Sequence, residues 1–279
     1  MRQRDVELPP DSGYNTPDGW CGVLMLTFAV FVFGTLVGSF LNVCIHRIPS
    51  GESIAFPASH CPQCHEPIKP YDNIPILSYL LLRGRCRHCA ASISRRYPLV
   101  EMLGGIAAVG AVCAFGATAE ALLIFAFLAA LIVITFIDVD HQIIPDAISI
   151  PGIFVGFAAA LIFGRPTWLS SLAGIALGGG ILWIIAAGYE WLSGREGMGG
   201  GDIKLLAMIG AFLGWRAIPV TVLLASLLGT VIGLSLMALR GRDTKMAIPF
   251  GPFLAAAAVC ALFWGDRLIA WYLNLARPI

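Results

Sequence analysis

Long uncharged stretches follow one another along almost the whole chain, and they constrain its fold more than any other feature. A helix needs about 20 apolar residues to cross the hydrocarbon layer of a membrane. The stretches comprise residues 21–45, 102–119, 121–137, 147–164, 166–189, 205–215, 217–239 and 246–265. We therefore predict an all-α polytopic membrane protein with about eight transmembrane helices. The sixth stretch reaches spanning length only if its helix begins near Asp202.

Composition excludes an ordinary soluble domain. Of the 279 residues, 58% are hydrophobic and 13% are charged, whereas soluble domains carry about 25% charged residues. We expect membrane lipid as a constant partner. The net charge of +1 says little about other partners, and nothing in the sequence indicates nucleic acid.

The distribution of lysine and arginine predicts the orientation. Of the 18 such residues, twelve lie in segments that follow the odd-numbered apolar stretches and six lie on the opposite side. Because positive charge is enriched in cytoplasmic loops, the long connection at residues 46–97 is predicted to be cytoplasmic and the termini external. Residues 1–20 are rich in proline and glycine and lack a cleavable signal pattern, so we predict a disordered arm there.

The cytoplasmic connection contains two CxxC motifs. Cys61 and Cys64 form the first and Cys86 and Cys89 the second, with 21 residues between them. This spacing is typical of a tetrathiolate zinc site, in which each motif supplies two sulfur ligands. Two disulfides or a redox pair are the alternative, but cytoplasmic thiols stay reduced. Four protein ligands leave no open position, which makes the zinc structural and zinc-based hydrolysis unexpected.

Two groups of carboxylates interrupt the apolar pattern where chemistry is expected. Asp202 ends a glycine-rich run that begins at Gly197, and Asp138, Asp140 and Asp146 follow the third apolar stretch. Ionisable groups at membrane depth are costly and indicate function. Lys204 is interpreted as an anchor at the membrane surface, with a role beside Asp202 as the alternative.

Ordered motifs then identify a resemblance. The sequence is similar to the type IV prepilin peptidases, membrane aspartic proteases of the GxGD type that often also N-methylate their products. The resemblance covers roughly residues 34–260. Its motifs are Gly38-Ser39-Phe40-Leu41-Asn42, the two CxxC pairs, Asp72-Asn73-Ile74-Pro75, Arg96-Tyr97-Pro98, Asp138-Val139-Asp140 with Pro145-Asp146, and Gly199-Gly200-Gly201-Asp202.

The resemblance implies a function and a domain plan. It implies that the protein removes the basic leader of type IV prepilins and type II secretion pseudopilins at the cytoplasmic face of the bacterial inner membrane, cutting after a glycine. It also implies methylation of the new amino terminus by S-adenosylmethionine. The implied modules are residues 34–117, with the zinc loop at 46–97, a peptidase core at 120–240 and a last transmembrane helix at 246–273.

The resemblance assigns Asp138 and Asp202 as the catalytic pair. Asp138 and Asp140 point to nearly opposite sides of a helix, so only one of them can face Asp202. Helix polarity favours the shared proton on Asp138, near the negative end of its helix. Active-site support is expected from Gly199 and Gly201, where backbone can approach closely, and from the polar Ser39 and Asn42, for which hydrogen bonding between helices is the alternative.

Two other classes of protein stay open. A proton-coupled secondary transporter also places carboxylates and a glycine-rich break inside a helix bundle, although no internal repeat is evident here. A non-catalytic, zinc-stapled assembly factor for pili or secretion is the second alternative. The sequence does not distinguish prepilin from pseudopilin substrates, because both present a leader followed by an apolar helix.

Overall fold

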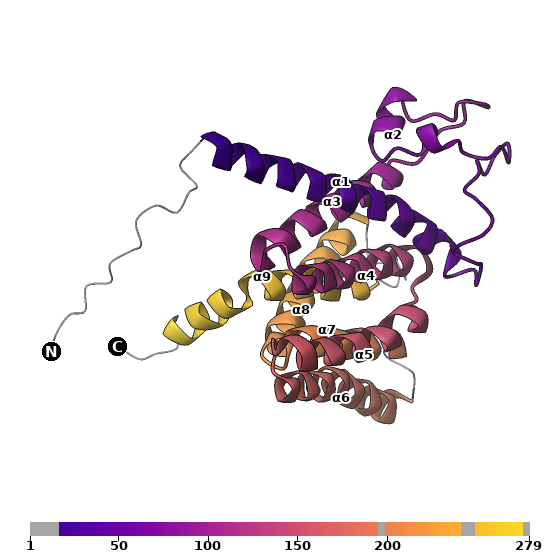
Figure 1. The fold of residues 1–279 in the computed structure, drawn as a ribbon. Coiled ribbons are helices and arrows are strands. Elements are labelled where there is room, and N and C mark those ends of the chain that lie inside the picture. Colours follow the sequence, from indigo (N-terminus) through magenta and orange to yellow (C-terminus); the bar gives the residue numbers. More distant parts are fainter. Residues whose placement is uncertain (1–16, 195–198, 241–248, 276–279) are drawn as a thin grey trace.

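The computed structural model describes residues 17–194, 199–240 and 249–275, and Figure 1 shows that they form a bundle of helices. No β-strand occurs among these residues. The main helices are α1 (Pro17–Arg47), α3 (Arg96–Phe115), α4 (Ala119–His141), α5 (Asp146–Phe163), α6 (Trp168–Ser193), α7 (Gly200–Leu213), α8 (Ala217–Arg240) and α9 (Gly251–Leu275). The predicted all-α fold is confirmed, with one helix for each of the eight apolar stretches.

Seven of these helices are long and apolar enough to cross a membrane, so the described part of the chain is that of a multi-pass membrane protein. The exception is α7. It begins near Asp202, as expected, but its 14 residues span only about 21 Å. The expectation that this stretch reaches spanning length is therefore wrong. The helix stops because Gly214 adopts a φ of 77°, which ends the helical path.

The short helix α7 is instead the buried centre of the peptidase half. Its residues from Leu205 to Phe212 are all buried. Glycines bring its backbone against α6, since a Cβ on Gly174 would lie 2.3 Å from the carbonyl oxygen of Gly210 and one on Gly178 would lie 2.5 Å from that of Leu206. Close approach of this kind is how membrane helices associate without a hydrophobic driving force.

A second glycine contact joins α1 to α3. A Cβ on Gly34 would lie 2.5 Å from the carbonyl oxygen of Gly104, and one on Gly38 would lie 2.6 Å from the Cα of Glu101. Figure 1 shows α1 and α3 together at one edge of the molecule, with the connection that contains the short helices η2 (Pro70–Asp72) and α2 (Leu77–Leu81) projecting beyond them. The tight α1 and α3 pair therefore carries the predicted zinc loop.

Some predicted features lie outside the described residues. Residues 1–16, most of the predicted arm, are among them, and α1 begins at Pro17, inside the range assigned to the arm. The others are residues 195–198, at the start of the glycine-rich run, and residues 241–248, which include the predicted start of the last helix.

Candidate active site and metal centre

Asp138 lies on α4, three residues before the helix ends, and its side chain points into the bundle. It is only 5% exposed. Its Oδ2 accepts a hydrogen bond of 2.9 Å from the backbone N–H of Gly251, the first residue of α9. A Cβ at position 251 would lie 2.6 Å from that oxygen, so glycine is needed for this contact. The start of α9 thus forms one wall around Asp138.

Asp202 lies in the first turn of α7, half-buried and close enough to Asp138 for their charges to interact. The contacts of Gly174 and Gly178 show that α6 runs antiparallel to α7. Counting from them at about 1.5 Å per residue, α6 continues about 16 Å beyond the level of Asp202. That end of α6 carries exposed apolar side chains suited to lipid, including Trp191 and Leu192. Asp202 therefore lies well short of that end of α6, beside a helix that is long and apolar enough to cross a membrane.

Asp140 takes no part in this arrangement. It is exposed, and its carboxylate binds the guanidinium of Arg96 at the start of α3. Arg96 also donates a hydrogen bond of 2.9 Å to the carbonyl oxygen of Phe136 and lies over that ring. Asp138 and Asp140 thus point to different sides of α4, as the helical spacing predicts, and Asp138 is the one near Asp202.

Three residues close to Asp202 in sequence, Gly199, Gly201 and Lys204, have different surroundings. A Cβ on Gly201 would lie 2.8 Å from the Cβ of Ile144, whereas one on Gly199 would meet open space. Lys204 Nζ lies 2.7 Å from both carboxylate oxygens of Asp146, the first residue of α5. Lys204 therefore joins α7 to α5, a contact that neither interpretation from the sequence included.

The four predicted zinc ligands lie together in the loop. Each of the four cysteines is a free thiol, and their sulfur atoms all lie within 4.8 Å of one another. The Sγ atoms of Cys61 and Cys89 are 3.8 Å apart. A tetrahedral zinc ion with Zn–S bonds of about 2.3 Å requires sulfur atoms about 3.8 Å apart. The arrangement therefore fits one tetrahedral metal ion.

Backbone donors prepare two of these thiols for metal binding. The N–H groups of Cys64 and Gln63 lower the pKa of Cys61 to about 6. The N–H groups of Cys89 and His88 likewise lower the pKa of Cys86. Because the thiolate and not the thiol binds metal, both motifs present one sulfur that is stabilised in the form that binds.

Ser39 and Asn42 lie apart from the two aspartates. Asn42 Nδ2 donates to the carbonyl oxygen of Tyr97 at 3.1 Å, across the contact between α1 and α3. Both residues line a cavity whose walls include neither Asp138 nor Asp202. Glu101, a buried carboxylate on α3, lines the same cavity and was not among the residues that the sequence indicated. Asn42 thus makes the hydrogen bond between helices that was the alternative, and support of the substrate or active site by Ser39 and Asn42 stays a prediction.

Comparisons with known proteins agree with this architecture. Residues 32–115 match the Bacterial Peptidase A24 N-terminal domain, and residues 122–234 match the Type IV leader peptidase family. No solved structure matches.

Several curated relatives align along nearly their whole length. The prepilin leader peptidase/N-methyltransferase of Aeromonas hydrophila is 40% identical over 272 residues, which cover 88% of this chain and 93% of the relative. Those of Stutzerimonas stutzeri and Pseudomonas aeruginosa are 37% and 36% identical, each over 91% of this chain and over 96% and 95% of the relative. The chain therefore belongs to the type IV leader peptidase family.

Proposed function

We propose that this protein is a membrane-embedded aspartic endopeptidase that removes the leader of type IV prepilins and then N-methylates the new amino terminus. The observation that carries the peptidase activity is the placement of Asp138 and Asp202. Two carboxylates from different helices interact inside a bundle of helices that are apolar enough to cross a membrane. A pair of carboxylates that shares one proton is the arrangement that aspartic proteases use.

In the proposed reaction the two carboxylates have different tasks. The ionised one takes a proton from water as the water oxygen attacks the scissile carbonyl, and the protonated one donates a hydrogen bond to the carbonyl oxygen. We assign the ionised state to Asp138, because the N–H of Gly251 at the positive start of α9 stabilises its charge. This reverses the assignment from helix polarity, which considered only α4 and α7.

The substrate class follows from the family and from the burial of Asp138 among helices that are apolar enough to cross a membrane. The leader is removed after the glycine that precedes an apolar helical segment, and that segment can lie in the membrane beside a recessed catalytic pair. Pseudopilins of type II secretion carry the same signal and are included. The Lys/Arg distribution supports a location in the bacterial inner membrane, with the zinc loop and catalytic pair at the cytoplasmic side.

The zinc site has a structural role in this proposal. The ion would be held by Cys61, Cys64, Cys86 and Cys89, which complete its coordination. It would therefore cross-link the loop and have no open coordination position. S-adenosylmethionine supplies the methyl group when it is bound. The protein's own contribution to that step is to hold the amino terminus and exclude water.

The direct test uses the whole protein, purified in detergent with its zinc. It is incubated with a full-length prepilin and S-adenosylmethionine, and the mass of the product is measured. We expect a product shortened at its amino terminus by the leader and carrying one additional methyl group. An uncut prepilin would exclude the peptidase, and a cut but unmethylated product would reduce the function to cleavage alone.

A further inference from the structure

A cavity of about 740 Å³ lies between the second half of α1, the start of α3 and the loop that carries the cysteines. This volume falls in the range of about 300–1,000 Å³ that is usual for small-molecule sites. Its walls are largely apolar, with Phe40 and Leu82 among them, and polar groups are contributed by Ser39 and Asn42. The proposed hydrolysis uses neither this space nor these side chains, so the cavity is available for another ligand.

Glu101 is the feature of this cavity that most requires a ligand. Three carboxylates line the cavity. Asp72 is bonded to Arg87 and Glu66 is exposed, but Glu101 is only 8% exposed and forms no ion pair with any described residue. Its contacts are to neutral donors: Oε2 accepts the backbone N–H of Ile76 at 2.7 Å, and the Ser39 side chain is also hydrogen-bonded to the carboxylate. A buried carboxylate without a cationic partner is costly, so a positively charged ligand would stabilise it.

The backbone that faces Glu101 is held in an unusual conformation. Ile76 has a φ of 61°, which a β-branched residue rarely adopts. Its N–H is thereby directed to the carboxylate. Strain of this kind persists only where surrounding contacts enforce it, and it concentrates at functional sites.

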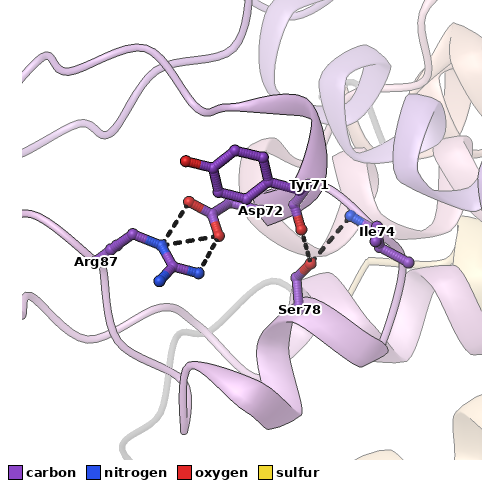
Figure 2. A network of polar contacts seen from close by, with 5 residues as sticks. All are labelled: Tyr71, Asp72, Ile74, Ser78 and Arg87. Atoms are coloured by element: carbon purple, nitrogen blue, oxygen red, sulfur yellow. Dashed lines mark hydrogen bonds and ion pairs between the residues drawn. The ribbon is translucent and has the colours of Figure 1, made fainter.

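Hydrogen bonds hold the chain on both sides of Ile76, and Figure 2 shows those among the neighbouring residues Tyr71, Ile74 and Ser78. Ser78 Oγ donates to the carbonyl oxygen of Tyr71 at 3.0 Å and accepts from the N–H of Ile74 at 3.1 Å. Arg87 binds both oxygens of Asp72, with Nε at 3.0 and 2.9 Å. Arg87 directly follows the zinc ligand Cys86. Its ion pair with Asp72 therefore connects residues 71–78, which line the cavity, to the predicted metal site.

We propose that this cavity binds S-adenosylmethionine and that Glu101 is the counter-ion for its positively charged methionine end, which carries the sulfonium and ammonium groups. The apolar walls accommodate the adenosine. This inference rests on the proposed N-methyltransferase activity and gives that activity a site separate from the aspartate pair. Glu101 is a binding residue for the methyl donor and has no part in leader cleavage.

The test is equilibrium binding of labelled S-adenosylmethionine to the full-length, zinc-loaded protein in lipid nanodiscs. Glu101→Gln removes the charge and keeps the shape, and Glu66→Gln is the matched control on an exposed carboxylate of the same cavity. We expect Glu101→Gln to weaken binding by about tenfold or more, since a charge-assisted contact is lost, and Glu66→Gln to change it by less than about twofold. Leader cleavage should be unchanged in both variants, which also shows that they fold.

A second measurement on the unsubstituted protein keeps the inference testable if Glu101→Gln does not fold. S-adenosylmethionine should slow amide hydrogen exchange at residues 71–82 and leave α7 unaffected. Unchanged affinity in Glu101→Gln, or protection at α7 in place of residues 71–82, would overturn the site while leaving the methyltransferase proposal intact. No binding by the unsubstituted protein would overturn both, and protection by a trimmed pilin peptide alone would assign the cavity to the methyl acceptor.

Discussion

The Oδ2 of Asp138 accepts the backbone N–H of Gly251 at 2.9 Å, so a carboxylate at the end of α4 meets the first residue of α9. The two residues are separated by 113 positions. A helix start carries free N–H groups and a partial positive charge, which stabilise an anion. This contact therefore fixes the orientation of Asp138 and supports the proposal that its carboxylate is the ionised one of the pair.

The first prediction concerns Gly251→Ala. The added Cβ would lie 2.6 Å from Asp138 Oδ2, so the carboxylate or the start of α9 must move. Loss of a hydrogen bond to a charged group corresponds to about tenfold or more in rate. We expect leader cleavage to fall by that factor with little change in thermal stability. Gly180→Ala is the control, because a Cβ there meets open space. Equal activity in both variants would show that the contact is unimportant.

The second prediction concerns the segment of residues 71–78, which lines one side of the cavity. The hydrogen bonds from Arg87 lower the pKa of Asp72, so their stabilising effect is complete above the ordinary aspartate pKa of about 3.9 and is lost as the pH falls through the lowered value. The stabilisation by the Arg87–Asp72 pair should therefore be the same at pH 6 and at pH 8. At pH 7, Asp72→Asn should speed amide exchange of residues 71–78 while the metal content stays unchanged, and Glu66→Gln should not. Unchanged exchange in Asp72→Asn would contradict the role of this pair.

The third prediction concerns the metal. Purified protein should contain about one zinc per chain, because four sulfurs complete one tetrahedral site. Removing it with a chelator should increase proteolysis of residues 53–94 before the helices unfold, and cleavage activity should fall with loss of loop structure. A protein without zinc whose four cysteines all react with an alkylating reagent in the native state would exclude the site.

The fourth prediction separates the two chemistries. Because the cavity does not include Asp138, the Asp138→Asn variant should still methylate a synthetic pilin segment that already has a free amino terminus. Methyl incorporation is measured with labelled S-adenosylmethionine, beside the unsubstituted protein. Complete loss in a folded Asp138→Asn variant would indicate one shared pocket.

The helices and the metal ligands were predictable because local patterns determine them. Apolar length marks a membrane helix, and the spacing of four cysteines marks a metal site. Helical rotation correctly separated Asp138 from Asp140. These features depend on residues that are close in sequence, or on ligands whose chemistry is specific.

The features that were missed depend on contacts between distant residues. Glu101 directly precedes the apolar stretch at residues 102–119 and was not singled out, but α3 begins at Arg96 and carries Glu101 into the bundle. Lys204 forms an ion pair with Asp146, 58 positions away, which no local pattern indicates. The contact between Asp138 and Gly251 is equally remote, so the assignment of the shared proton from helix polarity could not include the start of α9.

We propose that Asp138 and Asp202 together cleave the leader. The most direct measurement is the rate of prepilin cleavage by purified Asp138→Asn, Asp202→Asn and Asp140→Asn proteins at matched concentration and equal thermal stability. We predict that the first two variants lose cleavage, because the reaction needs both carboxylates, and that Asp140→Asn retains more activity than Asp138→Asn. Normal cleavage by Asp138→Asn or Asp202→Asn, or a greater loss in Asp140→Asn than in Asp138→Asn, would contradict the account.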